Sequence, residues 1–90
     1  MTLVSQSVEI TNVRGLHARS SAKFVGLATT LSTPVMVAKD ENSVVGTSIM
    51  GLMMLGAAKG DTITISAEGA GAADAVRALV ELVSSKFGED

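Results

Sequence analysis

The alternation of apolar and polar residues along the chain predicts four short strands. Residues 8–11 read Val-Glu-Ile-Thr and residues 62–67 read Thr-Ile-Thr-Ile-Ser-Ala, so each has one apolar and one polar face. Two further segments, residues 35–38 and 43–46, flank the turn sequence Asp-Glu-Asn at 40–42. We therefore expect these two segments to pair as a hairpin.

Three other segments carry apolar residues at helical spacing. The first, residues 18–31, has its apolar stripe at Ala18, Ala22, Val25, Ala28 and Leu31 and must end before Pro34. The second, residues 48–55, is short and strongly apolar. The third, residues 72–87, has an apolar face that ends at Phe87, with Arg77 and Glu81 spaced to pair on its polar side. We expect Gly88-Glu89-Asp90 to be a frayed tail.

The resulting element order is β-α-β-β-α-β-α. It predicts an α+β open-faced sandwich, in which helices cover one face of a four-stranded antiparallel sheet and the other face meets water. With 90 residues, no internal repeat and no linker, the chain is expected to form a single domain over residues 1–90.

The composition argues against several classes of binding site and partner. There is no cysteine, so disulfides and thiolate metal sites are excluded, and with one histidine we expect no metal and no cofactor. The net charge is −2, basic residues do not cluster, and Trp and Tyr are absent, so no nucleic acid is expected as a partner. The longest apolar run, residues 49–58, is shorter than the roughly 20 residues of a membrane span. No signal peptide is apparent, and we expect a monomeric cytoplasmic protein.

The single histidine, His17, lies between the loop glycine Gly15 and the first helical residues. The N-terminus of a helix offers unpaired backbone N–H groups and a partial positive charge, which suit an anion, phosphate above all. Arg19 can add a guanidinium, and Ser20 and Ser21 can add hydroxyl donors. Imidazole is also a capable nucleophile. The alternative is that His17 is only a helix cap or a solvated loop residue.

The segment Gly15-Leu16-His17-Ala18-Arg19 resembles the active-site motif of the HPr family, the histidine-containing phosphocarriers of the bacterial phosphotransferase system, including NPr of the nitrogen branch. The likeness extends to Ser48-Ile49-Met50-Gly51 and Ala58-Lys59-Gly60 and covers nearly the whole chain. It implies a carrier and not an enzyme: His17 would accept a phosphoryl group on Nδ1 from phospho-enzyme I and pass it to an EIIA-type protein.

By the same resemblance, Arg19 would stabilise the group in transfer. We also expect Ala18 and Ser20, which stand on either side of Arg19, to stabilise the phosphate from the start of the helix. Whether the carrier serves sugar uptake or the nitrogen branch stays open. The family usually has proline after the motif's arginine, whereas this chain has Ser20. Loss of that proline should cost only about 0.4–1 kcal/mol, and serine restores a backbone N–H that could face the phosphate.

Ser48 precedes the short apolar helix and is interpreted first as its N-cap. In the family, the matching serine is phosphorylated in many bacteria by HPr kinase/phosphorylase, so the resemblance implies a regulatory site. Because a short helix cannot bury all its side chains, some of Ile49, Met50 and Met53 should face water and contact partners. Core packing is the alternative for each.

Two other functions compete with a phosphocarrier. A small-ligand regulatory domain could share this element order. An acyl carrier with its prosthetic arm on Ser48 would need an all-helical chain with Asp before the serine, but Thr47 stands there. We therefore rank the acyl carrier last.

Overall fold

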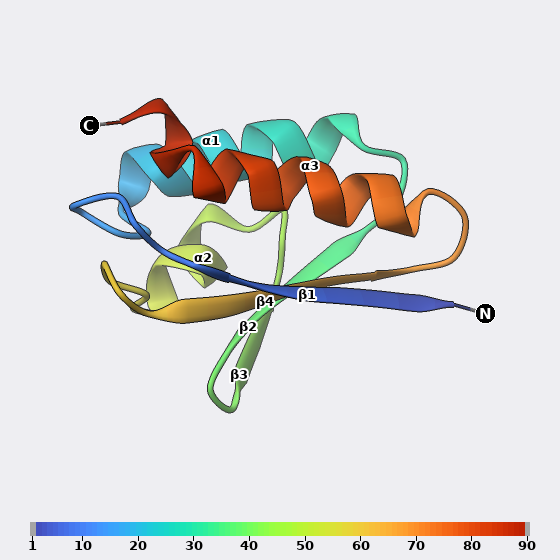
Figure 1. Cartoon of the computed structure of the whole chain (residues 1–90), viewed down its shortest axis with the longest axis horizontal. Coiled ribbons are helices and arrows are strands. Elements are labelled where there is room, and N and C mark those ends of the chain that lie inside the picture. Colours follow the sequence, from blue (N-terminus) through green and yellow to red (C-terminus); the bar gives the residue numbers. More distant parts are fainter. Residues whose placement is uncertain (1, 90) are drawn as a thin grey trace.

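The computed structural model describes residues 2–89 (Figure 1). Its strands are β1 (Leu3–Glu9), β2 (Val35–Lys39), β3 (Asn42–Val45) and β4 (Thr62–Glu68). Its helices are α1 (Ala18–Thr30), α2 (Ile49–Met54) and α3 (Ala72–Ser84), and a 3-10 turn, η1 (Lys86–Gly88), follows α3. No helix within this part of the chain is long and apolar enough to cross a membrane.

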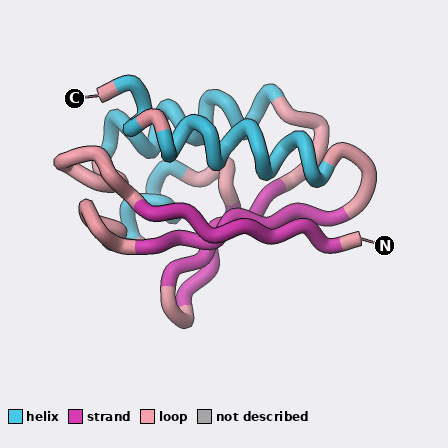
Figure 2. The backbone as a smooth tube through the Cα atoms, viewed as in Figure 1, coloured by secondary structure: helices cyan, strands magenta, loops and turns pink. Residues whose placement is uncertain are grey.

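The strands form one antiparallel sheet in the order β1-β4-β2-β3. All three helices lie on one side of the sheet, and the other side is bare (Figure 2). The predicted open-faced sandwich is therefore confirmed, as is the hairpin of β2 and β3.

The core lies between the sheet and the helices. Ile63 and Ile65 project from β4 toward Phe24 of α1, Leu52 of α2 and Leu79 of α3, and all five are fully buried. The outer face of the sheet carries hydroxyl side chains, with Ser7 and Thr64 hydrogen-bonded across β1 and β4 at 3.0 Å. This is the one-sided burial that an antiparallel sheet permits.

The first strand differs from its prediction. It was predicted over residues 8–11, but β1 starts five residues earlier, at Leu3, and ends at Glu9. Its pairing with β4 runs from Leu3 opposite Glu68 to Glu9 opposite Thr62. The exposed polar residue Gln6 interrupts the apolar alternation, so the first half of the strand depends on its partner and not on its own pattern.

The buried face of α1 also differs from its prediction. Ala18 and Ala22, expected in the apolar stripe, are exposed, whereas Ser20, Ser21 and Phe24 are buried. The ring of Phe24 gains far more from burial than the methyl group of an alanine, so it sets the rotation of the helix.

The C-terminal region differs most from expectation. The final helix ends at Ser84, not at Phe87, and the chain then turns back over α1. Arg77 pairs with Asp74 at 2.6 Å and not with Glu81. Glu89 was expected in a frayed tail but is held by hydrogen bonds, as described below; Asp90 lies outside the described residues.

Candidate functional site

The loop before α1 is shaped by Gly15. This residue has φ +65°, and a Cβ atom there would lie 2.4 Å from the carbonyl oxygen of Ala57, so only glycine fits without a shift of the backbone. The amide of Asn12 donates to the Gly15 carbonyl at 2.9 Å, and the N–H of Leu16 donates to the Ala57 carbonyl at 2.9 Å. The next residue, His17, is therefore placed by contacts on both sides of the loop.

His17 is the N-cap of α1, so the predicted location at a helix N-terminus is confirmed. Its ring Nδ1 accepts a hydrogen bond from the backbone N–H of Arg19 at 3.2 Å. Its own N–H donates to Ser20 Oγ at 3.0 Å, in a reciprocal capping arrangement. A role as helix cap and a role as nucleophile are therefore compatible for His17, because the capping hydrogen bond turns Nδ1 toward the N–H groups of the first turn.

The hydroxyls of Ser20 and Ser21 do not serve the site as expected. Both residues are fully buried, and Ser20 Oγ donates to the Gly15 carbonyl at 2.7 Å. Ser21 Oγ has no hydrogen-bond partner within residues 2–89. What the first turn offers an anion is its backbone: the N–H groups of Ala18, Arg19 and Ser20 have no carbonyl partner one turn earlier.

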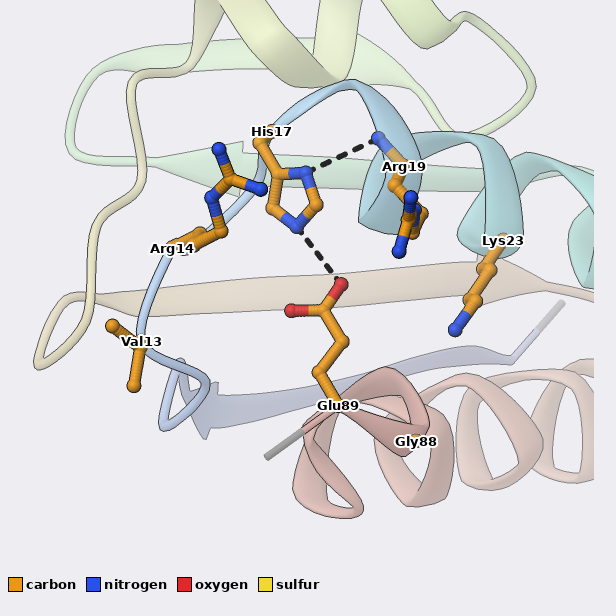
Figure 3. A pocket seen from close by; sticks show the side chains of 7 residues that line it. All are labelled: Val13, Arg14, His17, Arg19, Lys23, Gly88 and Glu89. Atoms are coloured by element: carbon orange, nitrogen blue, oxygen red, sulfur yellow. Dashed lines mark hydrogen bonds and ion pairs between the residues drawn. The ribbon is translucent and has the colours of Figure 1, made fainter.

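A residue that the sequence reasoning missed completes the site. Glu89 Oε2 lies 2.8 Å from Nε2 of His17 (Figure 3). The other carboxylate oxygen, Glu89 Oε1, accepts a hydrogen bond from Asn12 Nδ2 at 3.0 Å. Because the buried Asn12 amide also donates to the Gly15 carbonyl, it links the loop to the carboxylate. The two ring nitrogens of His17 are therefore held by different elements, Nδ1 by α1 and Nε2 by the C-terminal region.

A left-handed turn brings Glu89 to this position. Lys86, Phe87 and Gly88 all have positive φ, which reverses the chain after α3. Phe87 is buried and anchors the turn, and Lys23 Nζ of α1 donates to the Phe87 carbonyl at 2.8 Å. An apolar residue followed by glycine near the end of the sequence was the signal that could have indicated a docked turn.

His17 and Glu89 lie at the edge of an open cavity of about 420 Å³. Its lining consists of Val13, Arg14, His17, Arg19, Lys23, Gly88 and Glu89 (Figure 3). Arg14, Arg19 and Lys23 are cationic, and Glu89 is the one acidic residue in that lining. Three cations and a helix N-terminus make a cavity suited to a group with two negative charges.

Glu89 is ionised at neutral pH. Burial of the carboxyl group opposes its ionisation, but hydrogen bonds from Asn12 and His17 and the neighbouring charges of His17 and Lys23 outweigh burial. Together they hold the pKa of Glu89 below its ordinary value. An ionised carboxylate can only accept hydrogen bonds, so Nε2 of His17 is the donor in their contact.

Comparison with known proteins identifies the family. Residues 4–85 match the family model described as "PTS HPr component phosphorylation site". The chain belongs to the HPr family of phosphocarriers. It is 49% identical to phosphocarrier protein HPr of Neisseria meningitidis serogroup B over 87 residues, which are 97% of this chain and 98% of that protein. It is 38% identical to phosphocarrier protein NPr of Escherichia coli K12 over 88 residues, 97% of this chain and 98% of that one.

Solved structures agree with the HPr fold. The crystal structure of an HPr from Thermoanaerobacter tengcongensis superposes with a TM-score of 0.89 at 46% identity, covering 100% of this chain and 99% of that one. HPr from Bacillus anthracis gives a TM-score of 0.87 at 36% identity, covering 92% and 99%.

The second HPr motif forms the start of α2. Ser48 is its N-cap, because Ser48 Oγ accepts a hydrogen bond from the N–H of Gly51 at 2.9 Å, which confirms the capping interpretation. The helix exposes four large apolar side chains, which we call the methionine patch: Ile49, Met50, Met53 and Met54. The prediction that some of Ile49, Met50 and Met53 would face water is confirmed, since all three are exposed, and Met54, exposed by 79%, was missed.

Proposed function

We propose that this HPr-family protein accepts a phosphoryl group on Nδ1 of His17 from phospho-enzyme I and transfers it to an EIIA-type protein. It would do so as a monomer in the cytoplasm. The observation that carries the proposal is the setting of Nδ1, which lies at the N-terminus of α1 and beside a cavity lined by three cationic side chains.

The phosphoryl transfer requires no proton to be taken up or released. The lone pair of Nδ1 attacks phosphorus, the N–P bond of the donor phosphohistidine breaks, and the donor nitrogen recovers its electron pair. The proton of His17 stays on Nε2, so the phosphorylated ring carries a positive charge. In the second transfer the acceptor's nucleophile attacks phosphorus, the N–P bond to Nδ1 breaks, and Nδ1 recovers its electron pair.

The first turn of α1 stabilises the group in this scheme. The contact from the Arg19 N–H to Nδ1 is long, at 3.2 Å, and gives way when the N–P bond forms. The phosphoryl oxygens then accept hydrogen bonds from the N–H groups of Ala18, Arg19 and Ser20 and from the Arg19 guanidinium. The buried Ser20 hydroxyl takes no part, because it holds the loop at Gly15.

The methionine patch is the proposed docking surface for enzyme I and for the acceptor. It lies on α2, which packs beside α1 on the helical side of the sheet (Figure 1). Exposed apolar side chains favour protein partners, and flexible Met side chains adapt to more than one. Ile49, Met50 and Met53 would make these contacts.

Regulation at Ser48 is a second part of the proposal. A phosphate on Ser48 Oγ would sit at the start of α2, next to Ile49 of the patch, and would add up to two negative charges there. Charge and desolvation would then oppose docking of enzyme I. Incubation with HPr kinase/phosphorylase and ATP should label the wild type and not Ser48→Ala. An unlabelled wild type would refute regulation by phosphorylation at Ser48.

Purified enzyme I and phosphoenolpyruvate test the main proposal. The wild type should gain acid-labile, base-stable phosphate, and His17→Ala should gain none. An unlabelled wild type would favour the small-ligand regulatory domain instead. Transfer from the labelled protein to an EIIA protein of the sugar branch, set against one of the nitrogen branch, distinguishes an HPr-like from an NPr-like carrier.

A further inference from the structure

We propose that Glu89 is a positioning residue for phosphoryl transfer. It fixes the proton of the His17 ring on Nε2, turns Nδ1 toward the first turn of α1, and offsets the charge that forms on the ring. The inference rests on the proposed function only for the transfer step; the positioning of the ring stands on the contacts alone.

Both ring contacts select the same tautomer. The Glu89 carboxylate, 2.8 Å from Nε2, has no proton to donate, so Nε2 must carry one. The backbone N–H of Arg19 donates to Nδ1, so Nδ1 must present a lone pair. The atom that has to attack phosphorus is therefore kept unprotonated, while the other nitrogen is held in place.

The charge argument follows from the transfer step. When the N–P bond forms at Nδ1 and the proton remains on Nε2, the ring becomes cationic. The hydrogen bond from the uncharged ring to the Glu89 carboxylate then becomes an ion pair, in which both partners carry charge. A carboxylate in this position acts as the aspartate does in a Ser-His-Asp triad, where it orients the imidazole and stabilises the imidazolium.

The carboxylate is itself fixed before the reaction. Asn12 holds Oε1, buried Phe87 anchors the backbone two residues earlier, and Lys23 holds the Phe87 carbonyl. Among residues 2–89, the basic side chain in contact with the Glu89 carboxylate is that of His17, although Arg14 and Arg19 line the same cavity. The guanidinium groups are thus left for the phosphoryl oxygens, and Glu89 serves the ring.

Two variants and one control test the inference. Glu89→Gln keeps the shape of the side chain but removes its charge, and Glu89→Ala removes the contact. Glu81→Gln makes the same chemical change at an exposed position of α3 that does not line the cavity. The unmodified proteins are first compared by NMR of the imidazole at a pH where the ring is neutral. We expect a protected Nε2–H proton signal in the wild type and Glu81→Gln, and its loss in Glu89→Ala.

The rate of phosphorylation by enzyme I is then measured. We expect kcat to fall about tenfold in Glu89→Gln, by analogy with the partners that orient metal-ligating histidines, whose loss costs about 10–100-fold in affinity or activity. KM for phospho-enzyme I should not change, because Glu89 is not in the methionine patch. Glu81→Gln should match the wild type.

Three results would each refute a different claim: the positioning of the ring, the role of Glu89 in transfer, or the proposed function. An Nε2–H signal that survives in Glu89→Ala overturns the positioning of the ring. A wild-type rate in Glu89→Gln overturns the role in transfer. A wild type that takes up no phosphate refutes the proposed function, and the transfer role with it, while the NMR comparison still decides whether Glu89 positions the ring.

Discussion

Replacement of Gly15 by alanine should damage the site more than any other single methyl group added to a glycine of this chain. The new Cβ would lie 2.4 Å from the Ala57 carbonyl oxygen and 2.8 Å from Ala58 Cα. Both are backbone atoms, so no side chain can rotate away. Gly56 is a matched control, because it has the same φ of +65° and no atom within 4 Å of its own Cβ position.

The difference between the two variants can be worked out from these contacts. Alanine at positive φ lowers the free energy of unfolding by about 1–2 kcal/mol. Because alanine also reduces the conformational entropy of the unfolded chain, about 0.4–1 kcal/mol of this loss is offset. Gly56→Ala should therefore lose about 1 kcal/mol. Gly15→Ala must also part Leu16 from the Ala57 carbonyl and disturb the Asn12 contact with Gly15. Each hydrogen bond contributes about 1 kcal/mol, so we expect a total loss of about 3 kcal/mol.

Thermal unfolding followed by circular dichroism measures this difference, since the chain has no Trp or Tyr for fluorescence. At about 4–8 °C per kcal/mol for a domain of this size, Tm should fall about 4–8 °C in Gly56→Ala and about 12–24 °C in Gly15→Ala. Equal losses in the two variants would refute the reasoning, because they would mean that the loop accommodates the methyl group freely.

Three further predictions concern the same region and the patch. Ser20→Ala removes the hydroxyl that links the His17 N–H to the Gly15 carbonyl, and urea unfolding should show a loss of about 1–2 kcal/mol; an unchanged midpoint contradicts this. The contribution of Glu89 to stability should be complete above its ordinary pKa of 4.5 and disappear as the pH falls through its lowered pKa in the folded protein. The stability gap between wild type and Glu89→Gln, present at pH 5, should therefore close in stronger acid, and a gap that persists to pH 2 argues against it. Met50→Glu puts a charge on a side chain that is 68% exposed, so KM for phospho-enzyme I should rise severalfold while Tm stays within about 2 °C; an unchanged KM removes Met50 from the docking surface.

Local signals explain what the sequence could predict. A loop glycine followed by His17 and a helical run marks a helix start within a few residues, and that placement is confirmed. Ser48 before an apolar run is a similar short-range signal, and it is the N-cap expected. The order of strands and helices follows from periodicities within each segment, which is why the fold class was within reach.

Long-range packing explains what the sequence could not predict. The start of β1 depends on its pairing with β4, in which Leu3 lies opposite Glu68, more than sixty residues away. The rotation of α1 is set by burial of Phe24, although the alanines matched a helical stripe better. Glu89 reaches His17 across 72 positions of sequence, by way of a turn whose residues Lys86 and Phe87 adopt positive φ without being glycine. The local signal for such a turn is limited to Phe87 followed by Gly88, and it does not indicate that the turn brings Glu89 to His17.

The docked C-terminal turn decides where the protein can be labelled or fused. The start of β1 and the turn η1 lie at opposite ends of the molecule (Figure 1). A purification tag, fluorophore or fusion partner attached after residue 90 would begin two positions beyond Glu89 and crowd the imidazole, whereas one attached ahead of β1 would stay remote from it. Activities measured on proteins tagged at the two ends should therefore be compared before either is taken as native.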